Sequence, residues 1–221
     1  MNYRWNFDAV WANPEALLAG AAGTLRIFAI CLVLGLTLGL LVGLGRYSTR
    51  RWVYLPASAF VEFFRNTPVL VQILWFYFAL PMLLPFEISP LMAAALGISL
   101  NSAAFSGEIF RGGIQSLERG QWEGAQALGM TQGQAMRRII LPQAIKRMLP
   151  ALTNRAIEIF KMSTLASAVA YVELLQQGKL IASINFNPIE AYTVIALLFF
   201  AFLYPLVQAT YVLERRLRQG D

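Results

Sequence analysis

The sequence has no histidine, a single cysteine and few charged residues, with aspartate, glutamate, lysine and arginine making up 14% of its 221 residues. Without histidine, and with Cys31 as the lone thiol, the chain excludes a His-based catalytic triad, a Cys/His zinc site and an intrachain disulfide. A soluble domain of this length carries closer to a quarter charged residues. The scarcity of charge therefore points away from a soluble protein.

A nucleotide-binding loop is also missing from the sequence. The one Gly-Lys pair, Gly178-Lys179, is followed by Leu180, and Glu173 stands where a phosphate-binding loop has its first glycine. No nucleophile–base pair or metal-ligand cluster stands out either. We therefore expect no enzymatic activity and no cofactor in this chain, with any ATP and Mg²⁺ bound by a partner subunit.

Long apolar runs dominate what is present, because 57% of the residues are hydrophobic. The runs lack the strict alternation of a membrane β-barrel, and each approaches the roughly 20 residues that a helix needs to cross a bilayer. We predict an all-α integral membrane protein with five transmembrane helices at 17–44, 53–84, 91–110, 141–172 and 191–213. Pro68 should bend the second helix, and 174–187 reads as a polar interlude.

The predicted domain organisation is a single transmembrane unit, 17–215, with short flanking segments. Residues 1–16 contain Trp5, Phe7 and Trp11, which suit a periplasmic or interfacial segment, although a free tail fits equally well. Residues 216–221 form a short tail. In the first helix, Gly35, Gly39 and Gly43 recur every four residues, a spacing that lets membrane helices pack closely.

The distribution of basic residues predicts the orientation of the chain. The net charge of +6 would suit nucleic acid on a soluble protein, but here the basic residues flank apolar segments, so we expect no nucleic-acid partner. With the amino terminus outside, only Arg4 and Lys179 lie on the outer side. The inner side receives Arg46, Arg50, Arg51, Arg111, Arg119, Arg137, Arg138, Lys146, Arg147, Arg215, Arg216 and Arg218. This asymmetry predicts a periplasmic amino terminus and a cytoplasmic carboxyl terminus.

A polar stretch, 116–142, separates the third and fourth predicted helices and lies on the inner side in this topology. Residues 121–128 are enough for two helical turns, and Gly129 is a typical left-handed helix end. Thr131 and Gln134 have capping-box spacing for a second helix. Because such short helices are not stable alone, we expect a partner to pack here.

This stretch resembles the "EAA" loop of permease subunits of bacterial ABC importers. Its pattern is Glu-x-Ala, three residues, Gly, nine residues and Ile-x-Leu-Pro, matched by Glu123, Ala125, Gly129, Ile139, Leu141 and Pro142. Gly124 departs from the pattern by replacing an alanine, which lowers helix propensity by about 1 kcal/mol. In that family the loop is the coupling helix that docks on the ATPase. The resemblance implies this role for these residues and Leu128; the alternative is an ordinary juxtamembrane loop.

Other motifs extend the resemblance to the polar amino acid branch of the same family. They are Phe60-Val-Glu62-Phe-Phe-Arg65-Asn66-Thr67-Pro68, Glu108-Ile-Phe-Arg111-Gly112-Gly113, and Lys161-Met-Ser-Thr-Leu, where Met162 replaces the family's aspartate. The resemblance implies a type I, MetI-like permease fold in the bacterial inner membrane. It also implies two ATPase subunits, a second permease subunit and a periplasmic amino-acid-binding protein as partners.

Ionisable residues inside a predicted membrane helix are costly and usually face protein or a cavity. Arg155, Glu158 and Lys161 share one face of the fourth helix. One hypothesis is that this face lines the translocation pathway, where Arg155, helped by Asn154, receives the carboxylate of an acidic amino acid such as glutamate or aspartate. The alternative is that the three charges neutralise one another in helix packing.

We interpret four further ionisable residues as structural pairs. Two polar residues are weaker candidates for the translocation pathway. Glu62 and Arg65, and Glu108 and Arg111, are each three apart on one helix. Asn101 and Ser102 on the third helix are more often interhelical hydrogen-bonding groups than substrate ligands.

The sequence thus predicts the permease subunit of an ATP-driven importer for a polar amino acid, acidic as the best guess. An alternative is an ion-coupled secondary transporter working without an ATPase. Such a protein usually has an internal repeat, and none is visible. A membrane enzyme is a third reading without a visible active site.

Overall fold

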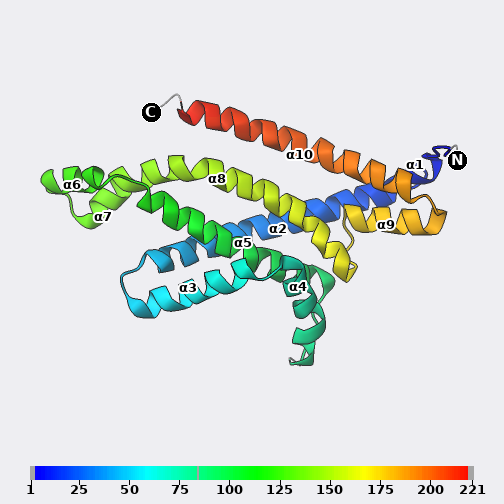
Figure 1. Cartoon of the computed structure of the whole chain (residues 1–221), viewed down its shortest axis with the longest axis horizontal. Helices are drawn as coiled ribbons and strands as arrows, with labels where there is room; N and C mark the ends of the chain where they lie inside the picture. The colour runs from blue at the N-terminus through cyan, green and yellow to red at the C-terminus, as the bar shows by residue number, and fades with distance from the viewer. Residues whose placement is uncertain (1–2, 84, 219–221) are drawn as a thin grey trace.

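The computed structural model describes residues 3–83 and 85–218, and the regular secondary structure of these residues is helical. The long helices run along one direction and form an elongated bundle (Figure 1). The amino terminus and α9 lie at one end, and the carboxyl end of α10 and the α6–α7 hairpin lie at the other. The elements are α1 (Asp8–Trp11), α2 (Pro14–Tyr47), α3 (Arg51–Asn66), α4 (Val69–Leu74), η1 (Trp75–Ala79), η2 (Leu80–Met82), α5 (Pro90–Gln115), α6 (Arg119–Ala127), α7 (Gln132–Ala135), η3 (Met136–Ile140), α8 (Leu141–Met162), η4 (Ser163–Val169), α9 (Leu174–Asn185) and α10 (Pro188–Arg218).

Helices α2 and α5 form the centre of the bundle, and small residues allow their backbones to approach closely. A Cβ added at Gly39 would lie 2.6 Å from the Cβ of Ser106, and one at Gly43 would lie 2.7 Å from the carbonyl oxygen of Gly107. Gly35 meets Ser102 in the same way. The packing role predicted for this glycine ridge is confirmed, because the ridge lets α5 lie close against α2.

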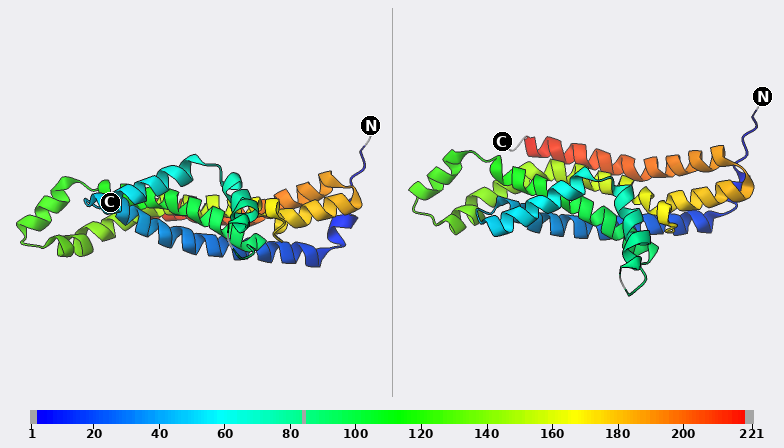
Figure 2. Two further views of the ribbon diagram at one scale, coloured as in Figure 1. Left: turned by 90° about the horizontal axis from the view of Figure 1, so that it is seen from below. Right: turned by 60° about the horizontal axis from the view of Figure 1, so that its bottom comes forward.

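The predicted second transmembrane helix is interrupted rather than bent. Helix α3 ends at Asn66, Thr67 is extended, and α4 begins at Val69. Proline disfavours the helical conformation of the residue before it and has no N–H to donate, so the chain leaves the bundle axis here and α4 projects sideways (Figures 1 and 2). The amide of Gln72 stabilises the corner by donating to the carbonyl oxygens of Phe64 and Thr67. Leu84, the last residue of the prediction, lies outside the described residues.

The predicted polar interlude at 174–187 is wrong, because most of it is helix α9. The Glu173 carboxylate caps this helix by accepting from the N–H groups of Leu175 and Gln176. Leu174, Gly178, Ile181 and Ala182 bury one face of α9, a helical spacing that its polar residues conceal. Helix α9 packs antiparallel to the start of α10 (Figure 1).

By length and composition, α2 and Pro188–Arg216 of α10 qualify as membrane-spanning helices, and Val69–Met82 is a shorter apolar segment. Helices α5 and α8 are less apolar for different reasons. Helix α5 buries several polar side chains inside the bundle, whereas most of the polar and charged residues of α8 are exposed. Five membrane crossings therefore remain a prediction. Of the predicted carboxyl-terminal tail, residues 219–221 lie outside the described part of the chain.

Candidate functional site: an end hairpin and a charged cavity

The α6–α7 hairpin has the local structure that the sequence predicts. Helix α6 covers Arg119–Ala127, and Gly129 adopts the left-handed conformation with φ of 73°. Thr131 and Gln134 form the expected capping box, in which the N–H of Gln134 donates to Thr131 Oγ1 and the N–H of Thr131 donates to Gln134 Oε1. Each helix is short, so the reversal at Gly129 and this cap define the hairpin.

The two faces of α6 have different environments. Ala125 is buried, and Trp122 on the same helix packs against the hydrophobic cluster at the base of the hairpin, as does Ile139. Ala125 therefore packs within the chain and is not part of the exposed surface of α6. Glu123, Gly124 and Leu128 are exposed, and a Cβ added at Gly124 would meet nothing. These three residues form a free outer face.

The hairpin connects directly to helix α8. The π-helical segment η3 carries Ile139, and Leu141 and Pro142 follow as the first residues of α8, both exposed. The Gln143 side chain donates to Gln121 on α6. The hairpin is thus joined to α8 both by the continuous chain and by this side-chain hydrogen bond.

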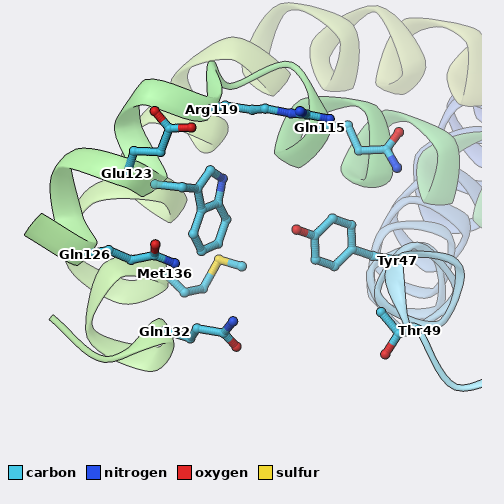
Figure 3. Close-up of a pocket in the computed structure, with 9 residues that line it drawn as sticks. Tyr47, Thr49, Gln115, Arg119, Glu123, Gln126, Gln132 and Met136 are labelled. Carbon is cyan, nitrogen blue, oxygen red and sulfur yellow. The ribbon is translucent and has the colours of Figure 1, made fainter.

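A groove of about 680 Å³ lies between the hairpin and the end of α2. Figure 3 shows Tyr47 and Thr49 on one side and Gln126, Gln132 and Met136 on the other. Arg119, Glu123, Trp122 and Gln115 complete the lining. The groove places the hairpin away from the body of the bundle, so α6 is accessible from more than one side.

The second region is centred on Arg155, whose guanidinium is enclosed by α5 and α8. Its side chain is 5% exposed, and Nη1 donates to Glu158 Oε2 at 2.8 Å. Nη2 donates to Asn101 Oδ1 at 3.1 Å and to Ser102 Oγ at 3.2 Å. The guanidinium carbon also lies 4.6 Å from the centre of the Phe105 ring. Arg155 is thus committed to partners inside the chain.

Glu158 is far more exposed than its partner Arg155, with 60% of its side chain accessible. It borders a cavity of about 480 Å³ between α3, α5 and α8. The cavity is lined by Arg65, Phe105, Glu108, Ile109, Ala151, Asn154, Arg155 and Glu158. Lys161, expected to continue this face, is exposed and is absent from the lining. On α8 the cavity is therefore lined by the exposed Glu158 carboxylate and by Arg155, whose guanidinium is paired with Glu158.

A cluster of arginines surrounds Glu108 at the edge of the same cavity. Arg46 Nη1 lies 2.6 Å from Oε1, and Arg111 donates to both carboxylate oxygens at 3.1 Å and 2.9 Å. The pairing of Glu108 with Arg111 is present in the structure. The predicted Glu62–Arg65 pair is wrong: Glu62 accepts instead from Asn66, and Arg65 turns toward Glu108. Residues three apart on one helix often pair, but the long side chain of Arg65 reaches Glu108 on α5 instead.

Phe105 is the cavity residue that the sequence reasoning missed. It follows Asn101 by four positions and precedes Glu108 by three, so all three share one face of α5. This spacing was a usable signal, but an aromatic residue in a predicted membrane helix is usually a packing or lipid-facing residue.

The chain can now be compared with known proteins. Residues 35–219 match the family of binding-protein-dependent transport system inner membrane components, and the chain belongs to this family. Members of the family are permease subunits of ABC importers, which work with ATPase subunits and a substrate-binding protein. The all-helical, MetI-like permease fold predicted from the sequence is confirmed.

Two relatives match nearly the whole chain. The arginine transport system permease protein ArtQ of Bacillus subtilis (strain 168) is 33% identical over 216 residues, 98% of this chain and 99% of that protein. The glutamine transport system permease protein GlnP of Escherichia coli (strain K12) is 36% identical over 219 residues, 99% of each.

Solved structures of ABC transporters share the fold of this chain. A crystal structure of an amino acid ABC transporter with histidines matches with a TM-score of 0.91 at 33% identity, covering 97% of this chain and 100% of that one. An inward-facing structure of the MetNI methionine ABC transporter matches with a TM-score of 0.77 at 24% identity, covering 95% and 98%. The second likeness supports the fold alone.

Proposed function

We propose that this chain is the permease subunit of an ATP-driven importer that carries a polar amino acid across the bacterial inner membrane. The observation that carries this proposal is the full-length similarity to permeases named for amino acids and their derivatives. ArtQ is named for arginine, GlnP for glutamine, and OccM of Rhizobium meliloti, 36% identical over 191 residues, for octopine. A cavity bordered by opposite charges is consistent with a zwitterionic cargo.

In this proposal the chain crosses the membrane five times, through α2, the interrupted α3–α4 segment, α5, α8 and α10. The amino terminus is periplasmic, and the α6–α7 hairpin and the carboxyl end of α10 are cytoplasmic. The basic residues support this orientation, since Arg46, Arg111, Arg137, Arg147 and Arg215 all belong to the hairpin end of the bundle. The importer would consist of two permeases, two ATPases and an external binding protein.

The free face of α6 is the proposed contact with the ATPase. Glu123 provides a carboxylate for N–H or guanidinium donors, Leu128 is 74% exposed, and Gly124 leaves space above the helix. ATP and Mg²⁺ are bound by the partner. When ATP draws the two ATPases together, the hairpins move, and Gln121, Leu141 and Pro142 pass that movement to α8. The ATP-bound partner must therefore favour one permease state over the other.

The proposed cargo site is the cavity beside Glu158 and Asn154. Arg155 positions Glu158 from behind, together with Asn101 and Ser102, and does not face the cargo as a free cation. The reason for preferring an acidic cargo was a free Arg155, so glutamate and aspartate keep no advantage over glutamine or arginine. Glu158 instead suits the ammonium group that every amino acid carries.

The test is uptake by the reconstituted importer, with permease, ATPase and binding protein in proteoliposomes. Labelled glutamate, aspartate, glutamine and arginine are offered outside, ATP is enclosed, and ion gradients are collapsed with ionophores. We expect uptake of at least one of them, and its loss when ATP is replaced by a non-hydrolysable analogue. Uptake driven by an ion gradient without ATP would support the secondary transporter instead and would contradict the proposal.

A further inference from the structure

Arg65 is the loosely held member of the arginine cluster around Glu108. Arg46 and Arg111 make close hydrogen bonds to the carboxylate, whereas Arg65 Nη1 lies 3.8 Å from Oε2, beyond hydrogen-bond distance. Within the described residues, the Arg65 side chain donates no hydrogen bond to any other group. One carboxylate thus faces three guanidinium groups, and Arg65 is the one whose bonding capacity is free.

The position of Arg65 directs that capacity into the cavity. Its side chain is 40% exposed and lines the same cavity as Glu158. Its guanidinium carbon lies 5.1 Å from the centre of the Phe105 ring, against which Arg155 also packs at 4.6 Å. Two cations on one ring repel each other, and an anion beside Arg65 would reduce that repulsion. Contact with the ring leaves the N–H groups of Arg65 free to donate.

We propose that Arg65 receives the α-carboxylate of the amino-acid cargo, while Glu158, across the same cavity, accepts its α-ammonium group. This inference rests on the proposed function and identifies the part of the cargo that the permease reads. Both groups are common to all amino acids. The cavity therefore recognises the amino-acid backbone, and the side chain of the cargo is discriminated elsewhere. The geometry also gives Arg65 two anionic neighbours: Glu108 when the cavity is empty and the cargo when it is filled.

The experiment compares each amino acid with its α-amide, which lacks the carboxylate and keeps the ammonium group. The permease–ATPase complex is placed in nanodiscs without the binding protein, so that only the membrane site is measured. Binding of labelled L-glutamate, L-glutamine and L-arginine is measured, and each is competed with isoglutamine, glutamine α-amide and argininamide respectively. The variants are Arg65→Gln and Arg65→Lys. Arg51→Gln is the matched control, because Arg51 is exposed, lies at the start of the same helix and is outside the cavity.

The wild-type complex should prefer the acid over its α-amide by at least about tenfold. Arg65→Gln should weaken binding of the acid by roughly 10- to 100-fold, the effect of losing a charge-assisted hydrogen bond, and leave the α-amide within about twofold. Arg65→Lys, which keeps the charge but not the planar fork, should give an intermediate loss. Arg51→Gln should bind as wild type does.

A preference for the acid that survives both substitutions would overturn the inference, even if overall affinity falls, because a purely structural role weakens acid and amide alike. If Arg65→Gln does not purify as a complex, the ratio of acid to α-amide affinity in Arg65→Lys decides. Normal ATP-driven uptake by a variant whose ratio of acid to α-amide affinity equals that of wild type would refute this inference and leave the proposed function intact. An importer that neither binds nor carries any of the amino acids would refute both.

Discussion

The α6–α7 hairpin and the cavity between α3, α5 and α8 differ in how far apart in the sequence their parts lie. The hairpin is made within residues 119–135 by a glycine turn and a capping box. The cavity takes Arg65 from α3, Phe105 and Glu108 from α5, and Glu158 from α8. Local signals therefore suffice for the first region, while the second exists only after three helices have packed. The hairpin should tolerate substitutions on its outer face, whereas the cavity should respond as one unit.

The largest effect is expected from Arg155→Ala. The change removes the partner of Glu158, Asn101 and Ser102 and leaves a void beside Phe105. Each buried polar group left unpaired costs about 1–3 kcal/mol, so we expect lower thermal stability in detergent together with loss of uptake. Hairpin variants should not lower stability in this way. Full stability and normal uptake in the variant would contradict the view of Arg155 as the residue that organises the cavity.

The second prediction concerns Glu173, a cap that is local in sequence but buried by packing. Burial raises the pKa of Glu173 to about 7, from an ordinary value of 4.5. Between these values the folded protein binds the proton more strongly than the unfolded chain, so stability should fall as pH rises from about 5 to about 7, by roughly 3 kcal/mol at most.

Unfolding of the detergent-solubilised protein at pH 5 and pH 7.5 measures this dependence. Glu173→Gln should flatten it, because an amide caps without titrating. Asp8→Asn serves as the control, since Asp8 is exposed at the same end of the bundle. A pH dependence that is unaltered by Glu173→Gln would show that other groups cause it.

The third prediction tests the turn of the hairpin through Gly129. Its φ of 73° is unfavourable for any residue with a Cβ, so Gly129→Ala should cost about 1–2 kcal/mol locally. We expect a clear loss of uptake with little change in the overall stability of the permease, because the hairpin protrudes from the bundle. The ratio of ATP hydrolysed to amino acid carried, measured in proteoliposomes, should rise. An unchanged ratio would mean that the turn does not orient the ATPase contact.

The smallest effect is expected from Gly124→Ala, the matched glycine-to-alanine substitution five residues before Gly129. A Cβ at this position meets no atom of the chain, and alanine favours the helix by about 1 kcal/mol. Uptake and ATP hydrolysis should remain within about twofold of wild type. A severe loss would mean that a partner backbone lies against this glycine, and the free face of α6 would then be a tighter contact than proposed.

The elements that could be predicted are those with a periodic or local signal. Composition and spacings of four residues or fewer predict four features of the fold. These are the long apolar helices, the glycine ridge of α2, the end of α6 at Gly129 and the cap at Thr131. Helix α9 was missed because its buried face is hidden among polar residues. The break at Thr67–Pro68 was predicted as a bend, since a proline signal indicates where a helix is disturbed but not by how much.

The charged residues show the limit of sequence reasoning more clearly. Arg155 and Glu158 were rightly grouped, but only the structure decides that the arginine is enclosed and the glutamate exposed. Spacing along one helix predicted that Arg65 would pair with Glu62, yet its long side chain reaches another helix.

The sequence alone determined that this chain is a helical membrane protein and where its polar hairpin lies, because hydrophobic length, glycine turns and caps act over neighbouring residues. Only the tertiary structure decided which charges are free to meet a ligand. That outcome depends on how α3, α5 and α8 approach one another, and electrostatic partners are selected by distance in space rather than along the chain.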